Sequence, residues 1–346
     1  MSEVKRGRDE NMAKRRGSRF RLRSIMSAAQ LRRGENPMSD GVAESAPQTA
    51  RYATGAMFGV SAVTVWATWL VVTRLGVTTT LSVYDLTMLR FGAAGVLLFP
   101  IVLRKGLALE RLGPLRLLIL VCSAGAPYVL VAASGLRLAP VAHAGALLPG
   151  SMPLFVALLS FLLTRERFTA SRLIGYALIA LGGAAIAGPG ALSFGETQIG
   201  HILLLSAAFV WAGYAIVLRA SGLDSLHAAA LVSTGSLILY GPLYLAFHGL
   251  HGMDAPLRDI VMQTLFQGVM VSIVALFLFG KGIELLGASA GAAFSALVPP
   301  MAALIAVPML GEIPSPIEQI ALLCVSIGVY LASGGRAPRW SMPRRG

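Results

Sequence analysis

The sequence repeats itself at a spacing of about 145 residues. Matched pairs at offsets of 145 or 146 are Trp66 and Trp211, Trp69 and Tyr214, Arg74 and Arg219, Pro153 and Pro299, Glu166 and Glu312, and Gly182 and Gly328. Each copy holds five apolar segments of membrane length, and an odd number of crossings places the two copies in opposite orientations. Inverted repeats of this kind are a signature of secondary transporters, so the sequence predicts an all-α membrane protein of ten transmembrane helices in two inverted five-helix repeats.

Composition supports the membrane assignment, because 55% of the residues are hydrophobic, only 13% are charged and the mean hydropathy is +0.72. Windows of about 20 residues predict ten spans: about 55–76, 84–103, 115–135, 139–164, 172–190, 199–218, 226–248, 259–280, 286–310 and 317–334. An outer-membrane barrel would instead show alternating segments of about ten residues. The predicted domains are a basic tail over 1–51, repeats over 52–190 and 197–335, and a second basic tail over 336–346.

Lys and Arg residues predict the orientation. Most of the 29 fall in the two tails and in loops on one side, whereas Arg74, Arg137 and Arg258 lie on the other. The positive-inside rule therefore predicts cytoplasmic termini in a plasma membrane, for which a bacterial inner membrane is our expectation. This topology accounts for the net charge of +13 without a nucleic-acid partner. The tail over 1–37 has the composition of a disordered segment, and Met38 is an alternative start that leaves its native translation open.

Three motifs carry a resemblance to a known family. These are Leu89-Arg90-Phe91 early in the second span, the run from Pro153 to Glu166, and its recurrence from Pro299 to Glu312. Over about residues 55–334 the chain resembles EamA-type transporters of the drug/metabolite transporter superfamily. The resemblance implies exporters and facilitators of amino acids, other metabolites or drugs that work by alternating access.

Polar, aromatic and helix-breaking residues within the spans are the candidates for a substrate site. They are Trp66, Trp69, Arg90, His143, Pro153, Trp211, Tyr214, Gln267 and Pro299. Each proline frees a backbone carbonyl that lipid cannot solvate, so the break should face protein or a watery cavity. The breaks either border the site as bending gates or only shape the bundle.

Each remaining candidate has a competing interpretation. The two aromatic pairs, three residues apart on one helical face, either enclose a substrate or face lipid or pack in the core. Arg90 either attracts a substrate carboxylate, extends its charged end to the membrane interface, or is paired within the protein. His143 either relays protons or packs between helices. Gln263 and Gln267, one turn apart, are candidates for hydrogen bonds in a cavity.

The predicted function is transport of a small metabolite, an amino acid or related amphiphile, most simply by export. Alternatives are efflux of drugs or cationic compounds and, in a different class, a structural or signalling membrane protein or a membrane enzyme. The carboxylates are dispersed near span ends, which disfavours an enzyme. His248 and His251 have no evident third ligand, so we expect no metal and no cofactor. Proton coupling stays open, and no oligomeric state is predicted.

Overall fold

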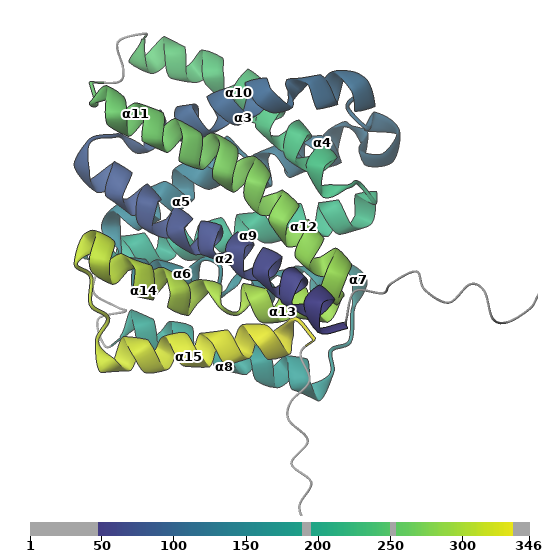
Figure 1. Cartoon of the computed structure of the whole chain (residues 1–346), viewed down its shortest axis with the longest axis vertical. Coiled ribbons are helices and arrows are strands. Elements are labelled where there is room, and N and C mark those ends of the chain that lie inside the picture. Colours follow the sequence, from purple (N-terminus) through teal and green to yellow (C-terminus); the bar gives the residue numbers. More distant parts are fainter. Residues whose placement is uncertain (1–47, 189–194, 250–253, 335–346) are drawn as a thin grey trace, which may run out of the picture. The chain divides into compact units, whose positions relative to one another are not determined.

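A computed structural model describes residues 48–188, 195–249 and 254–334. All regular structure in these ranges is helical, and nine helical segments are long and apolar enough to cross a membrane (Figure 1). The all-α prediction is therefore confirmed for the described residues. Residues 1–47 and 335–346, which hold most of both predicted tails, lie outside them, as does His251.

The helices follow one another with short connections. In chain order they are α2 (Gln48–Thr79), α3 (Val83–Lys105), α4 (Leu109–Ala124), α5 (Ala126–Leu138), α6 (Val141–Leu147), α7 (Met152–Thr164), α8 (Ala170–Ala187), α9 (Glu196–Ser221), α10 (Ser225–His248), α11 (Leu257–Gln263), the π-helix η2 (Thr264–Val274), α12 (Ala275–Leu286), α13 (Ala288–Ser295), α14 (Val298–Leu310) and α15 (Pro316–Ala332). Helix α15 is apolar but has only 17 residues, at the lower limit for crossing a bilayer.

Capping residues explain where two of these helices begin. At the start of α3, the Ser82 side chain accepts from the Asp85 backbone N–H, and the Asp85 carboxylate accepts from the Ser82 backbone N–H. Ser315 and Glu318 form the same capping box at the start of α15. Each box satisfies two backbone donors that the first helical turn leaves free.

Two helix pairs join the halves of the chain in antiparallel fashion. Helix α3 packs along α10: the Tyr244 hydroxyl donates to Asp85 at one end, and Lys105 pairs with Asp224 at the other. Helices α8 and α15 lie side by side (Figure 1). Their contacts also run in opposite directions, since residue 175 meets residue 328 and residue 182 meets residue 321.

Glycine allows the backbones of α8 and α15 to touch. A Cβ atom added at Gly175 would lie 2.7 Å from the carbonyl oxygen of Gly328, and one at Gly328 would lie 2.7 Å from that of Gly175. A Cβ at Gly182 would lie 2.9 Å from the carbonyl oxygen of Ala321. Close approach of this kind is how small residues hold membrane helices together, where burial of apolar surface gives no net drive.

Several spans are broken within the bundle. The break between α6 and α7 spans Leu148–Ser151, just before Pro153, and that between α13 and α14 lies just before Pro299. Gly145 of α6 packs against the backbone of Pro299, where an added Cβ would lie 3.2 Å from the Pro299 Cα and O atoms. The predicted breaks before Pro153 and Pro299 are thus present, and the second borders the contact between α6 and α14.

Candidate functional site

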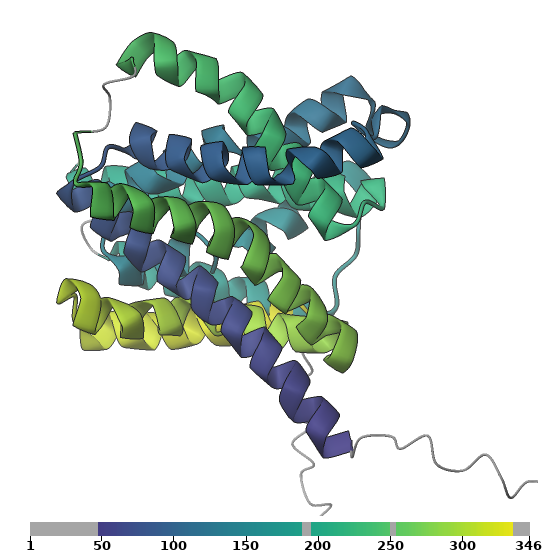
Figure 2. The same ribbon diagram turned by 45° about the horizontal axis from the view of Figure 1, so that its top comes forward.

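A hydrogen-bonded clamp holds α2 against η2 in the middle of the molecule. Gln267 is fully buried; its amide nitrogen donates to Thr73 Oγ1 (3.0 Å) and Gln263 Oε1 (3.2 Å), while its Oε1 accepts from Trp69 Nε1 (2.9 Å). Gln263 donates to the Val72 carbonyl at 2.8 Å. Helix α2 runs beside the α11–η2–α12 segment (Figures 1 and 2), and the two are antiparallel, since Gly55 lies against Leu286 and Gly76 against Gln263. With three bonds made, Gln267 is mostly satisfied and fixes the orientation of the Trp69 indole.

The Trp69 indole lies beneath a cation. The Arg90 guanidinium carbon lies 5.5 Å from the centre of the Trp69 ring and 5.7 Å from that of Phe91. Tyr128 of α5 stacks on Trp69 at a centroid distance of 6.4 Å. Arg90, Trp69 and Tyr128, which come from three helices, are called the Arg90 site below.

Arg90 has no anionic partner in the described part of the chain. Its Nε and Nη1 atoms are buried and form no hydrogen bond, although the residue as a whole keeps partial exposure. Asp85, five residues earlier, is engaged instead by Ser82 and Tyr244. A desolvated cation–π contact contributes about 2 kcal/mol, whereas an uncompensated buried charge costs several kcal/mol. The Trp69 ring therefore does not compensate Arg90, and the site is chemically suited to an anion.

The Arg90 site lies deep within its helices. Trp69 is 10 residues before Thr79 at the end of α2, and Tyr128 is 10 before Leu138 at the end of α5. Arg90 is 7 residues after Val83 at the start of α3. At 1.5 Å per residue these positions are about 10–15 Å from the helix ends, near the centre of an apolar layer about 30 Å thick.

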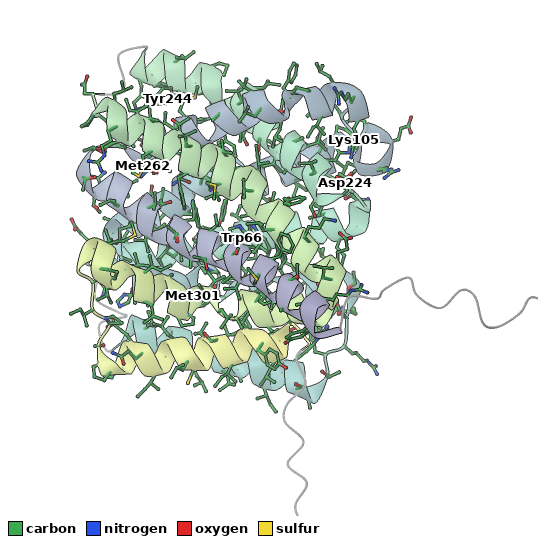
Figure 3. The ribbon with its side chains drawn as sticks, in the orientation of Figure 1. Trp66, Lys105, Asp224, Tyr244, Met262 and Met301 are labelled. Atoms are coloured by element: carbon green, nitrogen blue, oxygen red, sulfur yellow. The ribbon has the colours of Figure 1, made fainter. Side chains whose placement is uncertain are left out.

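The other predicted aromatic residues are not in contact with Arg90. Trp66 (Figure 3) packs on Phe279 of the neighbouring α12, with ring centroids 4.8 Å apart. Trp211 and Tyr214 of α9 lie 5.7 Å apart and pack against the core. The structure thus brings Trp69, Arg90 and Gln267 together, and places Trp66 and the α9 pair elsewhere along the interior.

An ion pair joins the two halves at one end of the bundle. This end, where α2, α5 and α14 finish and α6, α9 and α15 begin, is called the Glu312 end. Arg74 of α2 pairs with Glu312, and its Nη1 atom donates to the carbonyl oxygens of Leu136 and Ala139, each at 2.7 Å. The other oxygen of Glu312 accepts from the Val141 N–H at 2.7 Å. Arg74 thereby satisfies carbonyls at the end of α5, where a cation also complements the helix dipole.

Beside this ion pair, three titratable side chains form a line. His143 Nδ1 is 2.8 Å from Nε2 of His201, and His143 Nε2 contacts the Glu318 carboxylate. The three residues come from α6, α9 and α15. Since the two partners bind opposite nitrogens of His143, the three side chains do not converge on one point as metal ligands would. No group of three potential ligands suited to a metal occurs among the described residues.

The equivalent residues at the opposite end make different contacts. Glu166, which matches Glu312 in the repeat, pairs with Arg172 of the same half at 3.4 Å. Arg219, which matches Arg74, is exposed and forms no ion pair with Glu166. Within the described residues, the matched Arg and Glu pair therefore bridges the halves at the Glu312 end and not at the Glu166 end, where the cross-half ion pair is that of Lys105 and Asp224.

A separate apolar cavity of about 660 Å³ lies among α4, α5 and α10 and includes Cys122, Tyr240 and Phe247 in its lining. None of the predicted site residues lines it. Nearly all of its surface is apolar, so it offers little to recognise a polar solute.

Sequence reasoning missed the partners that the fold supplies. His201 and Glu318 are 58 and 175 residues from His143, and Tyr128 lies on a helix that had no predicted role. The repeat does carry a signal for one contact. Arg74 and Glu312 both lie at span ends, and each is matched by the same residue type in the other half, which favours their pairing. Lys281 and Glu284, three residues apart on α12, form an exposed ion pair at 2.7 Å.

Comparisons with known proteins agree with this architecture. The model of the EamA-like transporter family matches residues 53–188 and again 198–334. A probable terminal-alkyne amino-acid exporter of Streptantibioticus cattleyicolor is 27% identical over 210 residues, which cover 59% of this chain and 69% of that protein. The uncharacterized transporter YetK of Bacillus subtilis is 26% identical over 195 residues, covering 54% of this chain and 58% of its own length.

A solved crystal structure, described only as that of a protein, matches with a TM-score of 0.55 at 21% identity, over 81% of this chain and 96% of the other. This likeness shows the fold alone. The family model, in contrast, matches most of the chain, once in each half, and the described helices have the length and apolarity of membrane spans. The protein is a multi-pass membrane protein that belongs to the EamA-like transporter family, a family of transporters rather than enzymes.

Proposed function

We propose that this protein exports a small amphiphilic carboxylate, such as an amino acid or a related metabolite, across the plasma membrane. The observation that carries the proposal is the buried, unpaired guanidinium of Arg90 over the Trp69 ring. A carboxylate accepts charge-assisted hydrogen bonds from a guanidinium, and the Nε and Nη1 atoms of Arg90 have no partner. The amino-acid exporter among the relatives supports the same substrate class.

The surroundings of Arg90 favour a substrate with an apolar part. Trp69 and Tyr128 present ring faces beside the cation, and the rings of Trp66, Trp211 and Tyr214 lie partly buried along the interior. A buried cation repels cationic drugs, so the Arg90 site disfavours efflux of cationic compounds. Pro153 and Pro299 would serve as bending points that border the route.

The proposed topology is ten spans in two inverted repeats with cytoplasmic termini, which places the Glu312 end outside. Support comes from the antiparallel packing of α3 on α10 and of α8 on α15, because the repeat spacing matches each of these helices with its partner. Matched helices that run in opposite directions are expected of inverted repeats. The excess of Lys and Arg on the opposite side supports the orientation.

Alternating access is supported by the two matched Arg and Glu pairs. Arg74 and Glu312 bridge the halves at the Glu312 end, whereas Arg219 and Glu166 are apart. Exchange of the conformations of the two repeats would separate the first pair and join the second. The structure then represents the state closed at the Glu312 end.

The experiment is flux of a panel of labelled amino acids into sealed inverted vesicles. Each amino acid is compared with its amide, which lacks the negative charge that Arg90 would bind. Arg90→Gln should reduce carboxylate flux by about tenfold or more, since a hydrogen bond to a charged group contributes about 1.5–3 kcal/mol. Arg90→Lys keeps the charge but loses the planar guanidinium and its additional donors, so its flux should be intermediate.

The matched control is Arg116→Gln, which removes an exposed positive charge away from the site. Its flux should equal that of the parent. Equal transport of a carboxylate by the parent and by Arg90→Gln, at equal abundance, would remove Arg90 from the site. Preference of the parent for amides or cations would refute the substrate class.

A further inference from the structure

The line formed by His201, His143 and Glu318 joins the two halves at the end that we propose faces outside. His143 lies on α6 of the first half, whereas His201 and Glu318 lie on α9 and α15 of the second. Any movement that separates α6 from α15 at this end breaks the contact between His143 and Glu318. The protonation of the line and the closure of this end are therefore coupled through one contact.

Each member of the line is held in place by other contacts. One oxygen of Glu318 accepts from the Ser315 backbone N–H in the capping box, which leaves the other for His143. His201 is buried on α9, and α9 packs against α6. A carboxylate beside an imidazole favours the protonated form of the imidazole. Because both side chains are held in place, neither can move away when the proton binds.

Two protonation states satisfy the same geometry. With His143 neutral, its Nε2 donates to the Glu318 carboxylate, and its Nδ1 accepts from Nε2 of His201. With His143 protonated, both nitrogens donate, one to Glu318 and one to Nε2 of His201. Binding a proton therefore turns the hydrogen bond from neutral His143 to the Glu318 carboxylate into an ion pair. The hydrogen of His201 shifts from Nε2 to Nδ1, and none of the three side chains has to move.

The other charged groups near α6 are exposed or already paired, so the line of His201, His143 and Glu318 is the group expected to respond to pH. Helix α6 packs against α5, α8, α9, α14 and α15. The charged groups at the Glu312 end of these helices are Arg137 of α5 and Glu196 of α9, both exposed, together with Glu312 after α14, which is engaged by Arg74. The described residues of α8 and α14 bring no charge to this end.

We propose that His143, with His201 and Glu318, is a proton-binding site that closes the Glu312 end when a proton from the outer aqueous phase is bound. This site would make the proton the coupling ion of the proposed exporter. Its role in transport rests on the proposed function. The ion pair between protonated His143 and Glu318 exists only in the closed state. By linkage, the closed state binds the proton more tightly, so lower pH stabilises closure.

The test measures opening directly, in purified full-length protein without substrate. Cys122 and Cys324 are replaced by Ala, and Ala306→Cys is introduced on α14, which packs against α6 and buries Ala306. A water-soluble maleimide then labels the thiol only when this end opens. The labelling rate should fall by about fivefold or more between about pH 8 and pH 5, the range in which histidine titrates.

Labelling rates are compared with that of a free thiol at each pH, because maleimide reacts with the thiolate. His143→Gln keeps hydrogen-bonding capacity but takes up no proton, so its corrected rate should not depend on pH. Glu318→Gln should also remove most of the pH dependence of the labelling rate. This variant replaces His143→Gln in the test if His143→Gln does not fold. His248→Gln, at an exposed histidine that the same topology places on the outer side, should behave as the parent.

A corrected rate that is constant with pH in the parent, or that still falls with pH in both His143→Gln and Glu318→Gln, overturns the proton site. Neither result depends on substrate. Loss of carboxylate selectivity in the flux experiment would overturn the proposed function while leaving the labelling result intact, so the two failures are distinguishable.

Discussion

Arg165 shows how a single residue can depart from the pattern of its matched half. It ends α7 in the left-handed conformation (φ 55°, ψ 33°), and its counterpart Gly311 ends α14 in the same region (φ 71°, ψ 12°). A residue with a Cβ atom pays about 1–2 kcal/mol there, whereas glycine does not. The sequence difference between the two halves at this position therefore has a cost in stability.

Arg165→Gly should raise the free energy of unfolding by up to about 1 kcal/mol. Relief of left-handed strain exceeds the added freedom of the unfolded chain, which costs about 0.4–1 kcal/mol, and the lost contact of Arg165 with the Phe161 ring reduces the gain. Thermal melting in detergent measures the change. Arg167→Gly, two residues on and without a positive φ, should lower the melting temperature; equal shifts in the two variants would contradict the strain argument.

The sequence predicted which residue types matter better than which residues meet. Trp69, Arg90 and Gln267 were all selected because polar and aromatic groups are rare in apolar spans, and they do lie together. Whether they bind substrate stays a prediction. The partners of His143 were missed because hydropathy and repeat spacing carry no information on which helix faces which, and that is decided by packing of the whole bundle.

At the scale of helices, the start of α10 is tied to the end of α3. Asp224 accepts from the His227 N–H at 2.9 Å as the N-cap of α10, and from Lys105 Nζ at 2.8 Å (Figure 3). The hydrogen bond from Lys105, with that from the His227 backbone, holds the pKa of Asp224 below its ordinary value. Because both side chains of the ion pair are largely exposed, the cap contributes more to stability than the pair does.

Asp224→Ala should lower the free energy of unfolding by about 0.5–2 kcal/mol at neutral pH, the usual cost of a lost cap. Asp224→Asn keeps the cap and should cost less. Since the folded pKa is depressed, the carboxylate contributes fully above its unfolded pKa of about 3.9, and this contribution is lost as pH falls through the folded value. Melting curves from neutral pH to about pH 3 should therefore fall less steeply for Asp224→Asn than for the parent.

The exposed Asp254→Asn is the control and should follow the parent through the same acid range. An Asp224→Asn curve parallel to that of the parent would show that the ionised form of Asp224 gives no stability.

The existence of the helices, in contrast to these contacts, was predictable from sequence, because long apolar runs leave the backbone no alternative in lipid. The division into shorter helices was predictable only where proline marks it, as at Pro153 and Pro299.

For the whole molecule, the two matched ion pairs should exclude each other. In a background without Cys122 and Cys324, Glu166→Cys with Arg219→Cys should be joined by a short bifunctional thiol reagent only while the Glu312 end is open. Joining Arg74→Cys to Glu312→Cys first should therefore reduce cross-linking of the Glu166 pair severalfold. Gel mobility after protease cleavage between the halves measures each product, and formation of both cross-links in one molecule would contradict alternating access.

The seam between α8 and α15 contains the same contact twice. Gly182 meets Ala321 as Gly328 meets Gly175, and the repeat spacing matches Gly182 with Gly328 and Gly175 with Ala321. Such self-complementary contact is otherwise found where two identical subunits associate about a two-fold axis. Made from two separate genes, the halves would still carry surfaces that recognise each other.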